Sequence, residues 1–242
     1  MLRITFDGPD GVGKTNLINY LAHTLRWYGY GPLSVCKKLM IFREPYDWFP
    51  VDGMSWEDVE EAKGLIRGTK LTRAQFDTFT QYRLLMLGEI QRGLQGDLAR
   101  PPGFDAIVLQ DRSTVSTIAY NMDGDVPLLA WCGVVAPCNI ILLGPKKRPD
   151  DAPLDDIDAD EIKQMRVRRV FESMPHYTRA VDGFTLVKVE SQESARDVAL
   201  AEVGRCTDLR LDHPLSYIRR HEHPPVGTTA AEVLPWLYAA GR

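Results

Sequence analysis

The feature that most constrains this sequence is a glycine-rich stretch near its start. Residues 8–15 read Gly-Pro-Asp-Gly-Val-Gly-Lys-Thr and match the pattern G-x-x-x-x-G-K-[ST] in full. The stretch follows an apolar run at 2–7 and opens an amphipathic run from Lys14 to about Tyr28. A turn between a strand and a helix directs backbone N–H groups and the positive end of the helix towards one anion. We therefore expect residues 8–15 to bind phosphate.

Each chemically active residue of this stretch has an expected role. The residues that would surround the phosphates of ATP are Gly8, Pro9, Asp10, Gly11, Val12, Gly13, Lys14 and Thr15. Lys14 would contact the β- and γ-phosphates as a catalytic residue, and the hydroxyl of Thr15 would bind Mg²⁺. The pattern predicts ATP and Mg²⁺ as cofactors but does not identify the reaction.

The rest of the chain alternates between apolar and amphipathic runs. Patterns typical of strands occupy residues 2–7, 34–42, 105–110, 139–143 and 184–189, and helical spacing occupies 14–28, 57–67, 72–96, 114–121, 161–173 and 192–204. Strands that alternate with helices form right-handed crossovers and a parallel sheet. The prediction is an α/β protein of three layers, α/β/α, with a parallel sheet of about five strands.

Composition narrows the class of protein. The 242 residues suffice for one α/β domain and a short appendage, and the formal charge is −4. Proteins that neutralise many nucleic-acid phosphates are normally basic, so we expect small-molecule nucleotides as partners and no nucleic acid. No apolar run reaches the roughly 20 residues of a membrane span, and no secretory signal is expected before the first strand. The four cysteines form no CxxC pair, which favours reduced thiols and a cytoplasmic location.

Three segments with charged side chains directly follow predicted strands, at 8–15, 43–45 and 111–113. Ligands of parallel α/β sheets bind outside the carboxyl ends of the strands, so these segments should meet at one edge. Arg43 and Arg112 stay charged and can bind a phosphate through two nitrogens. This arrangement suits phosphoryl transfer, which needs fixed cations between two anionic reactants.

Taken together, these segments resemble the thymidylate kinase family of nucleoside monophosphate kinases over residues 1–204. The resemblance rests on the order and spacing of residues 8–15, Phe42-Arg43-Glu44-Pro45, Phe79-Thr80-Gln81-Tyr82-Arg83, and Asp111-Arg112-Ser113 with Ser116 and Tyr120. It implies a domain of the P-loop kinase fold at 1–204 that phosphorylates a deoxynucleoside monophosphate, first of all dTMP to dTDP. Such kinases are often homodimers. Residues 205–242 lie outside the resemblance, as an extension of unknown role.

The resemblance also implies roles at the phosphate end of the site. Arg43 would hold the acceptor phosphate, and Arg112 would bring the two phosphates together as a catalytic residue. Asp111 would join Thr15 at the magnesium site, through water. Asp10 would accept the sugar 3′-hydroxyl and belong to the catalytic group. The alternative for both arginines is a surface ion pair.

At the base end, Phe79 and Arg83 are one helical turn apart and share a face. By the resemblance, Phe79 would stack on the base and Arg83 would donate to a base oxygen. Ser116 would bond a base edge, and Tyr120 would line the sugar and favour deoxyribose. The alternatives are a core position for Phe79, a solvated position for Arg83, and ordinary helix positions for Ser116 and Tyr120.

In kinases of this type a lid follows the strand at 139–143, and we place it at about 144–162. Family members with glycine at the position of Gly11, rather than arginine, supply a catalytic arginine from the lid. Arg148 is the first candidate for that role. Weaker candidates are Lys146 and Lys147, and alternatives farther along are Arg166, Arg168 and Arg169.

The segment after Arg43-Glu44-Pro45 departs from the family pattern, because Tyr46-Asp47-Trp48 stands where Gly-Gly-Thr is usual. A Glu-Pro followed closely by tryptophan is also similar to deoxynucleoside kinases. In that case Glu44 would act as base towards a 5′-hydroxyl, and Gln81 and Trp48 would contact the ligand. The arginines expected at the acceptor site favour a monophosphate instead. The altered segment also fits a modified pyrimidine.

A less favoured alternative is a P-loop protein that hydrolyses nucleotide without transferring phosphate to an acceptor. A GTPase of this kind would need Asn-Lys-x-Asp, which the sequence lacks. An AAA-type ATPase or helicase would need a hydrophobic strand that ends in Asp-Glu. Here the strand at 105–110 continues into Asp111-Arg112.

Overall fold

A computed structural model describes residues 1–34, 36–68, 70–95, 105–122, 136, 138–144, 161–174, 177–181 and 184–207. Residues Met1–Thr207 form one compact unit. The predicted extension at 205–242 lies almost wholly outside the described residues, and the boundary at residue 204 stays a prediction. The lid candidates Lys146, Lys147 and Arg148 also lie outside them.

The centre of this unit is a six-stranded sheet. Its strands are β1 (Leu2–Asp7), β2 (Lys37–Arg43), β3 (Asp105–Asp111), β4 (Cys138–Leu142), β5 (Tyr177–Val181) and β6 (Phe184–Val189). They lie in the order β2-β3-β1-β4-β6-β5, and all neighbours are parallel except β5, which is antiparallel to β6. The five predicted strands are therefore confirmed as a parallel sheet. The edge strand β5 is an addition that the sequence did not indicate.

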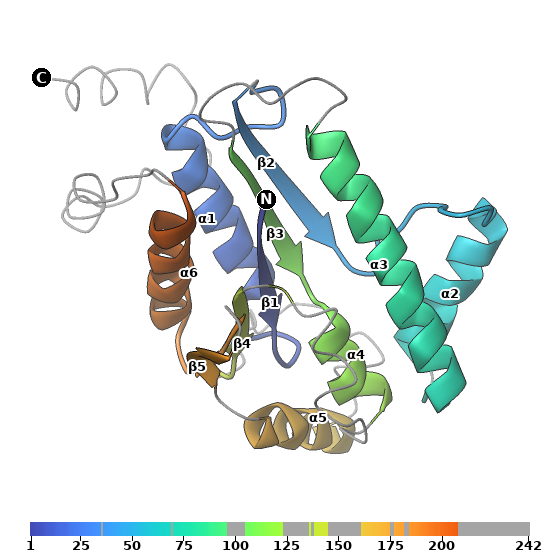
Figure 1. The fold of residues 1–242 in the computed structure, drawn as a ribbon. Coiled ribbons are helices and arrows are strands. Elements are labelled where there is room, and N and C mark those ends of the chain that lie inside the picture. The colour runs from blue at the N-terminus through green and yellow to red at the C-terminus, as the bar shows by residue number, and fades with distance from the viewer. Residues whose placement is uncertain are drawn as a thin grey trace, which may run out of the picture. The chain divides into compact units, whose positions relative to one another are not determined.

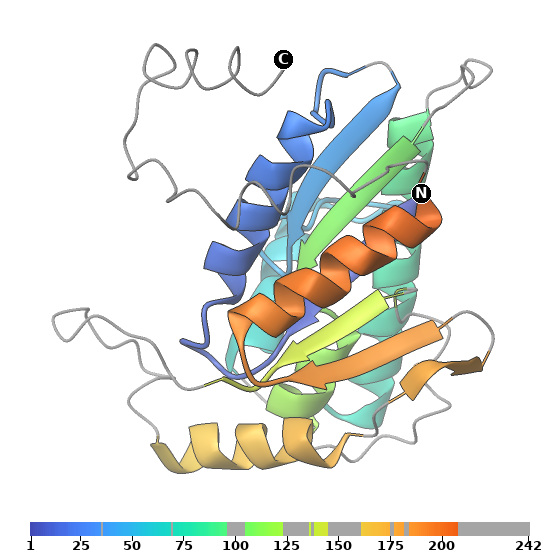
Figure 2. The same cartoon turned by 90° about the vertical axis from the view of Figure 1, so that its left-hand side faces the viewer.

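Helices cover both faces of the sheet, which confirms the three layers (Figure 1). They are α1 (Lys14–Trp27), α2 (Trp56–Gly68), α3 (Arg73–Gln95), α4 (Thr114–Asn121), α5 (Glu161–Ser173) and α6 (Gln192–Cys206). Figure 2 shows α1 and α6 in front of the strands, with α3 and α4 behind them. None of the helices in the described ranges has the length and apolarity needed to cross a bilayer.

Two apolar clusters join the sheet to the helices on the second face. Over β2 and β3, Phe42 and Val108 pack with residues of α2, α3 and the segment after β2, including Val59, Phe79, Tyr82 and Trp48. Over β4 and β6, Ile141 and Leu186 pack with Phe76, Ile118 and Phe171. The central strands are buried on both sides, which is why they read as continuous apolar runs. These clusters hold α3 and α4 over the carboxyl ends of the strands.

The register of the sheet brings three strand ends together. Asp111 at the end of β3 is paired with Phe6 of β1 and with Arg43 of β2. The backbone continues the pairing past the strands, because the N–H of Glu44 donates to the carbonyl oxygen of Asp111 at 2.9 Å. The segments at 8–15, 43–45 and 111–113 therefore begin at one edge of the sheet, as the sequence predicted.

Candidate active site

Residues 8–15, which we call the phosphate-binding turn after their predicted role, form the expected turn between β1 and α1. Gly8 and Gly13 have positive φ angles of 140° and 92°. A β-carbon on Gly8 would lie 2.2 Å from the carbonyl oxygen of Leu142 in β4, so a residue with a side chain would force the turn away from the sheet. Gly13 directly precedes α1, whose first N–H groups have no carbonyl partner within the helix. The N-terminus of α1 is thus available to an anion.

Lys14 is folded into this turn. Its Nζ donates to the backbone carbonyl oxygens of Gly8 at 3.0 Å and Pro9 at 2.8 Å, and the side chain is buried. Burial, followed by the positive charge of Arg112, lowers the pKa of Lys14 to about 8. A bound phosphate would add negative charge beside this buried ammonium group.

Thr15 and Asp111 bring two oxygen ligands together at the same edge. Oγ1 of Thr15 donates to Oδ2 of Asp111 at 2.8 Å. Mg²⁺ prefers oxygen ligands and usually completes its shell with water and phosphate oxygens, so this pair fits its chemistry. Within the described ranges, no cluster of three His, Cys, Asp or Glu side chains could hold a metal ion by itself. The residues present therefore suit a Mg²⁺ ion that is shared with a nucleotide.

Arg112 lies where the phosphate-binding turn meets the rest of the site. Its Nη2 forms an ion pair with Oδ1 of Asp10, and its guanidinium carbon is 5.0 Å from the ring centre of Tyr120. The backbone of Arg112 has a φ angle of 65°, a conformation that residues other than glycine seldom adopt and that often occurs at functional sites. Burial, followed by the charge of Asp10, raises the pKa of Tyr120, so the phenol stays neutral. Asp10, Arg112 and Tyr120 thus form one contact group.

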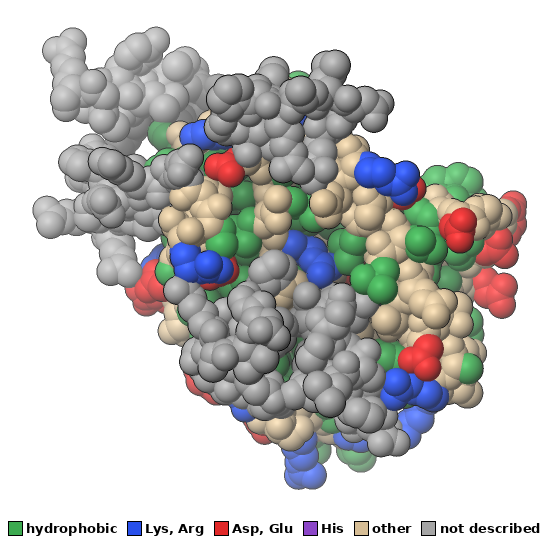
Figure 3. All heavy atoms as spheres, in the orientation of Figure 1, with side chains coloured by type: hydrophobic (Ala, Val, Ile, Leu, Met, Phe, Trp, Pro, Cys, Tyr) green, Lys and Arg blue, Asp and Glu red, His purple; other side chains and the backbone are tan. Residues whose placement is uncertain are grey.

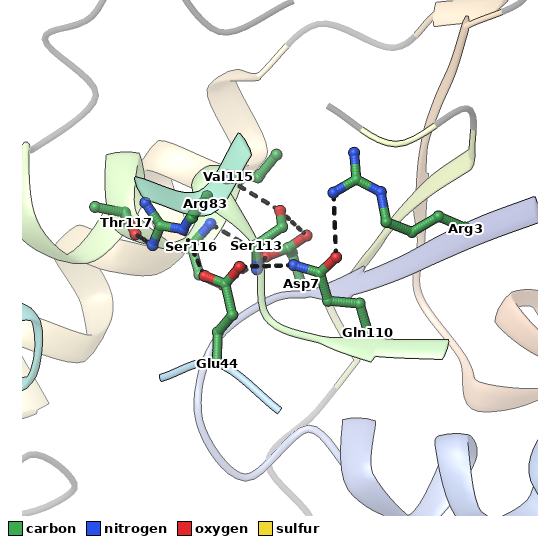
Figure 4. Close-up of polar contacts among 9 residues, drawn as sticks. All are labelled: Arg3, Asp7, Glu44, Arg83, Gln110, Ser113, Val115, Ser116 and Thr117. Carbon is green, nitrogen blue, oxygen red and sulfur yellow. Dashed lines mark hydrogen bonds and ion pairs between the residues drawn. The ribbon is translucent and has the colours of Figure 1, made fainter. Parts of the chain in front are cut away.

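Asp7, the last residue of β1, fixes the segment that follows Arg112 (Figure 4). Its carboxylate accepts from the backbone N–H groups of Ser113 at 2.9 Å and Ser116 at 3.1 Å. It also accepts from their hydroxyls, at 2.7 Å and 2.6 Å. Asp7 is fully buried, so these four hydrogen bonds replace water. This side chain caps the N-terminal turn of α4 and sets its position relative to the phosphate-binding turn.

A second buried network surrounds Glu44 (Figure 4). Oε2 of Glu44 lies 2.6 Å from Nε of Arg83, and Oε1 accepts from the side-chain amide of Gln110 at 2.8 Å. Nη2 of Arg83 donates to the hydroxyl of Thr117. Burial raises the pKa of Glu44, and the neighbouring Arg83 opposes that shift. The guanidinium carbon of Arg83 also lies 5.2 Å from the ring centre of Trp48. These contacts hold Arg83 in one orientation.

A cavity of about 430 Å³ lies beside the phosphate-binding turn. Of that turn, only Asp10 and Gly11 line it. The remaining wall comes from Glu44, Pro45 and Tyr46, from Ile66, Arg67, Gly68 and Lys70, from Arg83, from Arg112, Ser113, Ser116, Thr117, Tyr120 and Asn121, and from Lys163 and Arg166 of α5. In Figure 3, basic side chains are visible in the middle of the face on which β3 ends. Pockets for small ligands have volumes of roughly 300–1,000 Å³, so this one suits a mononucleotide.

Five of the predicted substrate residues meet at this cavity, and two do not. Asp10, Arg83, Arg112, Ser116 and Tyr120 line it. Arg43 does not, because its side chain is 58% exposed and forms an ion pair with Asp47. Phe79 is buried in the apolar cluster over β2 and β3, with its ring centre 6.1 Å from that of Trp48.

The structure also shows where the residues expected for a deoxynucleoside kinase lie. Glu44 lines the cavity, whereas Gln81 is exposed on α3 and Trp48 is buried behind Arg83. Of the alternatives to Arg148, Arg166 lines the cavity. Arg168 pairs instead with Glu172, at 2.8 Å.

Several residues of the site were not identified from the sequence. Asp7 had a usable signal, since it is a carboxylate at the end of a buried strand directly before the glycine-rich turn. Thr117 and Asn121 had a weaker one, because they lie on the helix that follows Arg112. Arg67 and Lys70 had none, because contacts of their segment with α3 and α4, which are distant in sequence, bring them to the cavity.

No protein-family model and no curated protein match this sequence. Among solved structures, thymidylate kinase from Candida albicans is similar with a TM-score of 0.50 and 15% identity, over 85% of this chain and 92% of that one. Thymidylate kinase from Ehrlichia chaffeensis aligns with a TM-score of 0.45 and 18% identity, over 84% of this chain and 98% of that one. The first likeness shows that this chain shares its fold with a thymidylate kinase.

Proposed function

We propose that this chain is a nucleoside monophosphate kinase that transfers the γ-phosphoryl group of ATP to a pyrimidine deoxynucleotide, with dTMP as the first candidate. The observation that carries the proposal is the cavity beside the phosphate-binding turn. Asp10 of that turn lines the cavity and forms an ion pair with Arg112, which also lines it. A protein that only hydrolyses ATP needs one nucleotide site. A kinase needs room for a second ligand next to the first, and this cavity provides it.

On the donor side, the turn at 8–15 and the N-terminus of α1 would hold the phosphates of ATP. Lys14 would release the carbonyl oxygens of Gly8 and Pro9 and contact the β- and γ-phosphates. Thr15 and Asp111 would hold Mg²⁺, which neutralises charge on the phosphates when it is bound. The structure supports this assignment through the short contact between the two oxygen ligands.

In the transfer, an oxygen of the acceptor phosphate would bond to the γ-phosphorus of ATP while the bond to the β–γ bridging oxygen breaks. ADP and a nucleoside diphosphate are the products. Arg112 lies between the turn and the cavity, so we place its guanidinium between the two phosphates. Its present partner, Asp10, would exchange that contact for the 3′-hydroxyl of the acceptor sugar.

At the far side of the cavity, Arg83 would read the base. Nη1 of Arg83 is buried and has no hydrogen-bond partner among the described residues. A buried donor without a partner costs roughly 1–3 kcal/mol, and a base carbonyl would remove that cost. Thymine and uracil carry a carbonyl at position 4, whereas cytosine carries an amino group there. The stacking role of Phe79 stays a prediction.

The α5 residues Lys163 and Arg166 line the cavity. Among the residues that the structure describes, we assign Arg166 as the candidate for the catalytic arginine that the resemblance places in the lid. Arg148 stays a prediction because it lies outside the described residues.

One observation favours the deoxynucleoside kinase as a second candidate, since Glu44 is a buried carboxylate on the cavity wall. Burial raises its pKa, which would suit a base. Both of its oxygens, however, already accept hydrogen bonds, from Arg83 and Gln110. Gln81, the expected base-reading residue of that class, is exposed on α3. These contacts favour the monophosphate kinase.

A substrate panel tests the proposal. The full chain is incubated with ATP, Mg²⁺ and either dTMP, dUMP, dCMP, dGMP, dAMP or the matching nucleosides, and the product is identified. We expect dTDP from dTMP, and no product from Lys14→Ala. Conversion of thymidine but not dTMP would establish the nucleoside kinase. ATP hydrolysis at one rate with every acceptor and with none would leave only an ATPase.

A further inference from the structure

The three residues that depart from the family pattern each contact a different arginine. Asp47 forms an ion pair with Arg43, with Oδ1 3.1 Å from Nη2. The ring centre of Tyr46 lies 4.7 Å from the guanidinium carbon of Arg67, and that of Trp48 lies 5.2 Å from Arg83. The segment 46–48 therefore sets the positions of three cations, two of which line the cavity.

Arg43 is held away from the cavity. Asp47 accepts from Nη2, from Nε at 3.2 Å and from the backbone N–H of Arg43 at 2.8 Å. The hydrogen bond and charge of Asp47 raise the pKa of Arg43 above its ordinary value. To bind a ligand in the cavity, Arg43 would have to give up the contact in which Asp47 accepts from both Nε and Nη2.

Arg67 is in the cavity wall, at the end of α2. The backbone on both sides of it is tied to α4, because the side-chain amide of Asn121 donates to the carbonyl oxygen of Ile66 at 2.9 Å. In addition, the N–H of Leu71 donates to the carbonyl oxygen of Asn121 at 3.1 Å. The guanidinium carbon of Arg67 lies 4.7 Å from the ring centre of Tyr46. Tyr46, Arg67 and Arg112 all line the same cavity.

The cavity wall carries more positive than negative side chains, which favours a negatively charged ligand. Six basic side chains line it, against two carboxylates, in a chain whose formal charge is −4. Both carboxylates are already paired, Asp10 with Arg112 and Glu44 with Arg83. The six basic side chains exceed the two carboxylates by four, and a phosphate monoester with roughly two negative charges would offset about half of that excess.

From these contacts we propose that Arg67, positioned by Tyr46, binds the 5′-phosphate of the acceptor together with Arg112, in place of Arg43. This inference rests on the proposed function. In this chain Asp47 removes the arginine at position 43 from the site, and Tyr46 brings in another from α2. The number of cations around the acceptor phosphate would thus stay the same, but one of them would come from α2 instead of from the end of β2.

Equilibrium binding of dTMP and of thymidine to the full chain, by calorimetry, separates the phosphate contact from all others. Arg67→Met keeps the apolar stem and should weaken dTMP binding by about tenfold while thymidine binding stays within about twofold. Arg43→Met is the matched control and should leave both ligands within about twofold. Arg67→Lys should lose part of the affinity for dTMP, because a point charge lacks the planar fork.

Tyr46 is tested as a positioning residue. Tyr46→Phe keeps the ring and should bind dTMP like the unmodified chain, whereas Tyr46→Leu should move towards Arg67→Met. In turnover assays Arg67→Met should raise KM for dTMP and leave KM for ATP unchanged. Melting temperatures of all variants check the fold, and Arg67→Gln replaces Arg67→Met if the latter fails to fold.

The outcomes separate this inference from the proposed function. If Arg43→Met loses dTMP selectively and Arg67→Met does not, the inference is wrong although the kinase assignment stands. Equal losses of dTMP and thymidine in Arg67→Met would also overturn it, since they indicate a structural role. If the unmodified chain neither binds nor phosphorylates dTMP, the proposed function fails and the inference with it.

Discussion

Arg83 and Glu44 form a buried ion pair, with Nε of the arginine 2.6 Å from Oε2 of the glutamate and each side chain 3% exposed. The pair joins the middle of α3 to the end of β2, across 39 positions of sequence. It also fixes the one arginine whose Nη1 is buried without a partner among the described residues. The contact therefore holds α3 and the end of β2 together and also fixes two side chains of the cavity wall.

Removing one partner of this pair should destabilise the protein strongly. Arg83→Met leaves the carboxylate of Glu44 buried and unpaired, at a cost of roughly 3–5 kcal/mol, measurable by urea denaturation at pH 7. Burial raises the pKa of Glu44, so the folded variant takes up a proton before the unfolded chain does. The loss should therefore shrink as pH falls.

Two controls accompany that measurement. Glu44→Gln combined with Arg83→Met removes the unpaired charge and should be less destabilised than Arg83→Met alone. Arg73→Met breaks an exposed pair with Asp77 and should cost less than about 1 kcal/mol. A loss in Arg83→Met no larger than in Arg73→Met would contradict the prediction.

Asp7→Asn should cost stability through the N-terminal turn of α4. The amide retains the shape of the side chain but directs a donor at groups that themselves donate, so at least about 2 kcal/mol should be lost. Asp58→Asn is a useful comparison, because Asp58 also contacts a helix start, through Ser55, but is exposed to water. Denaturant midpoints that fall equally in both variants would show that burial of Asp7 does not matter.

The affinity for ATP should fall as pH rises above about 8, the pKa of Lys14 in the free protein. The charged amine binds phosphate, and raising the pH removes the charge, so affinity for a non-hydrolysable ATP analogue with Mg²⁺ should weaken by up to about tenfold per pH unit. Lys14→Met should bind weakly with no such dependence. Constant affinity of the unmodified chain between pH 7 and 9.5 would refute the assignment.

The same titration has an effect on stability with the opposite sense. The pKa of Lys14 lies below its ordinary value of 10.5, so the folded protein loses this proton before the unfolded chain does. The contribution of Lys14 to the free energy of unfolding should therefore rise between about pH 8 and 10.5, and Lys14→Met should abolish that rise.

Gly8→Ala and Gly64→Ala should change stability in opposite directions. At Gly8 the new methyl would lie 2.2 Å from the oxygen of Leu142 and the φ angle of 140° disfavours any side chain, so the variant should be destabilised and inactive. Gly64 is inside α2 with open space around it, and alanine there should add about 0.5–1 kcal/mol. Thermal melting of both variants decides the matter, and a stable, active Gly8→Ala would contradict the close packing of the turn.

The burial of each strand explains whether the sequence predicted it. β1, β3 and β4 have apolar neighbours on both faces, so their residues form runs that no surface segment would tolerate. β5 is an antiparallel edge strand, Tyr177–Val181, with a threonine and an arginine in its five residues, and no continuous apolar run marks it. Such a strand depends on its partner β6 and leaves little trace in its own sequence.

The same distinction applies to the residues of the site. Some are positioned by the strand just before them, and others by contacts that the strand does not determine. Residues 8–15 and 111–113 were predictable because their roles depend on the strand just before them. The direction of Arg43 was not, because it is decided by Asp47, one turn later in the chain, rather than by the strand. Arg67 reaches the cavity because α2 packs on α3 and because the backbone near Arg67 is hydrogen-bonded to Asn121 of α4, and no short motif records these contacts.

The helix α4 is attached at both of its ends to different walls of the site. Asp7 fixes its first turn beside the turn at 8–15, and the amide of Asn121, its last residue, fixes the backbone next to Arg67. These two contacts are joined by one continuous helix of eight residues. We therefore expect occupancy of the proposed ATP site and occupancy of the cavity to influence each other, and linkage requires that the two effects be equal.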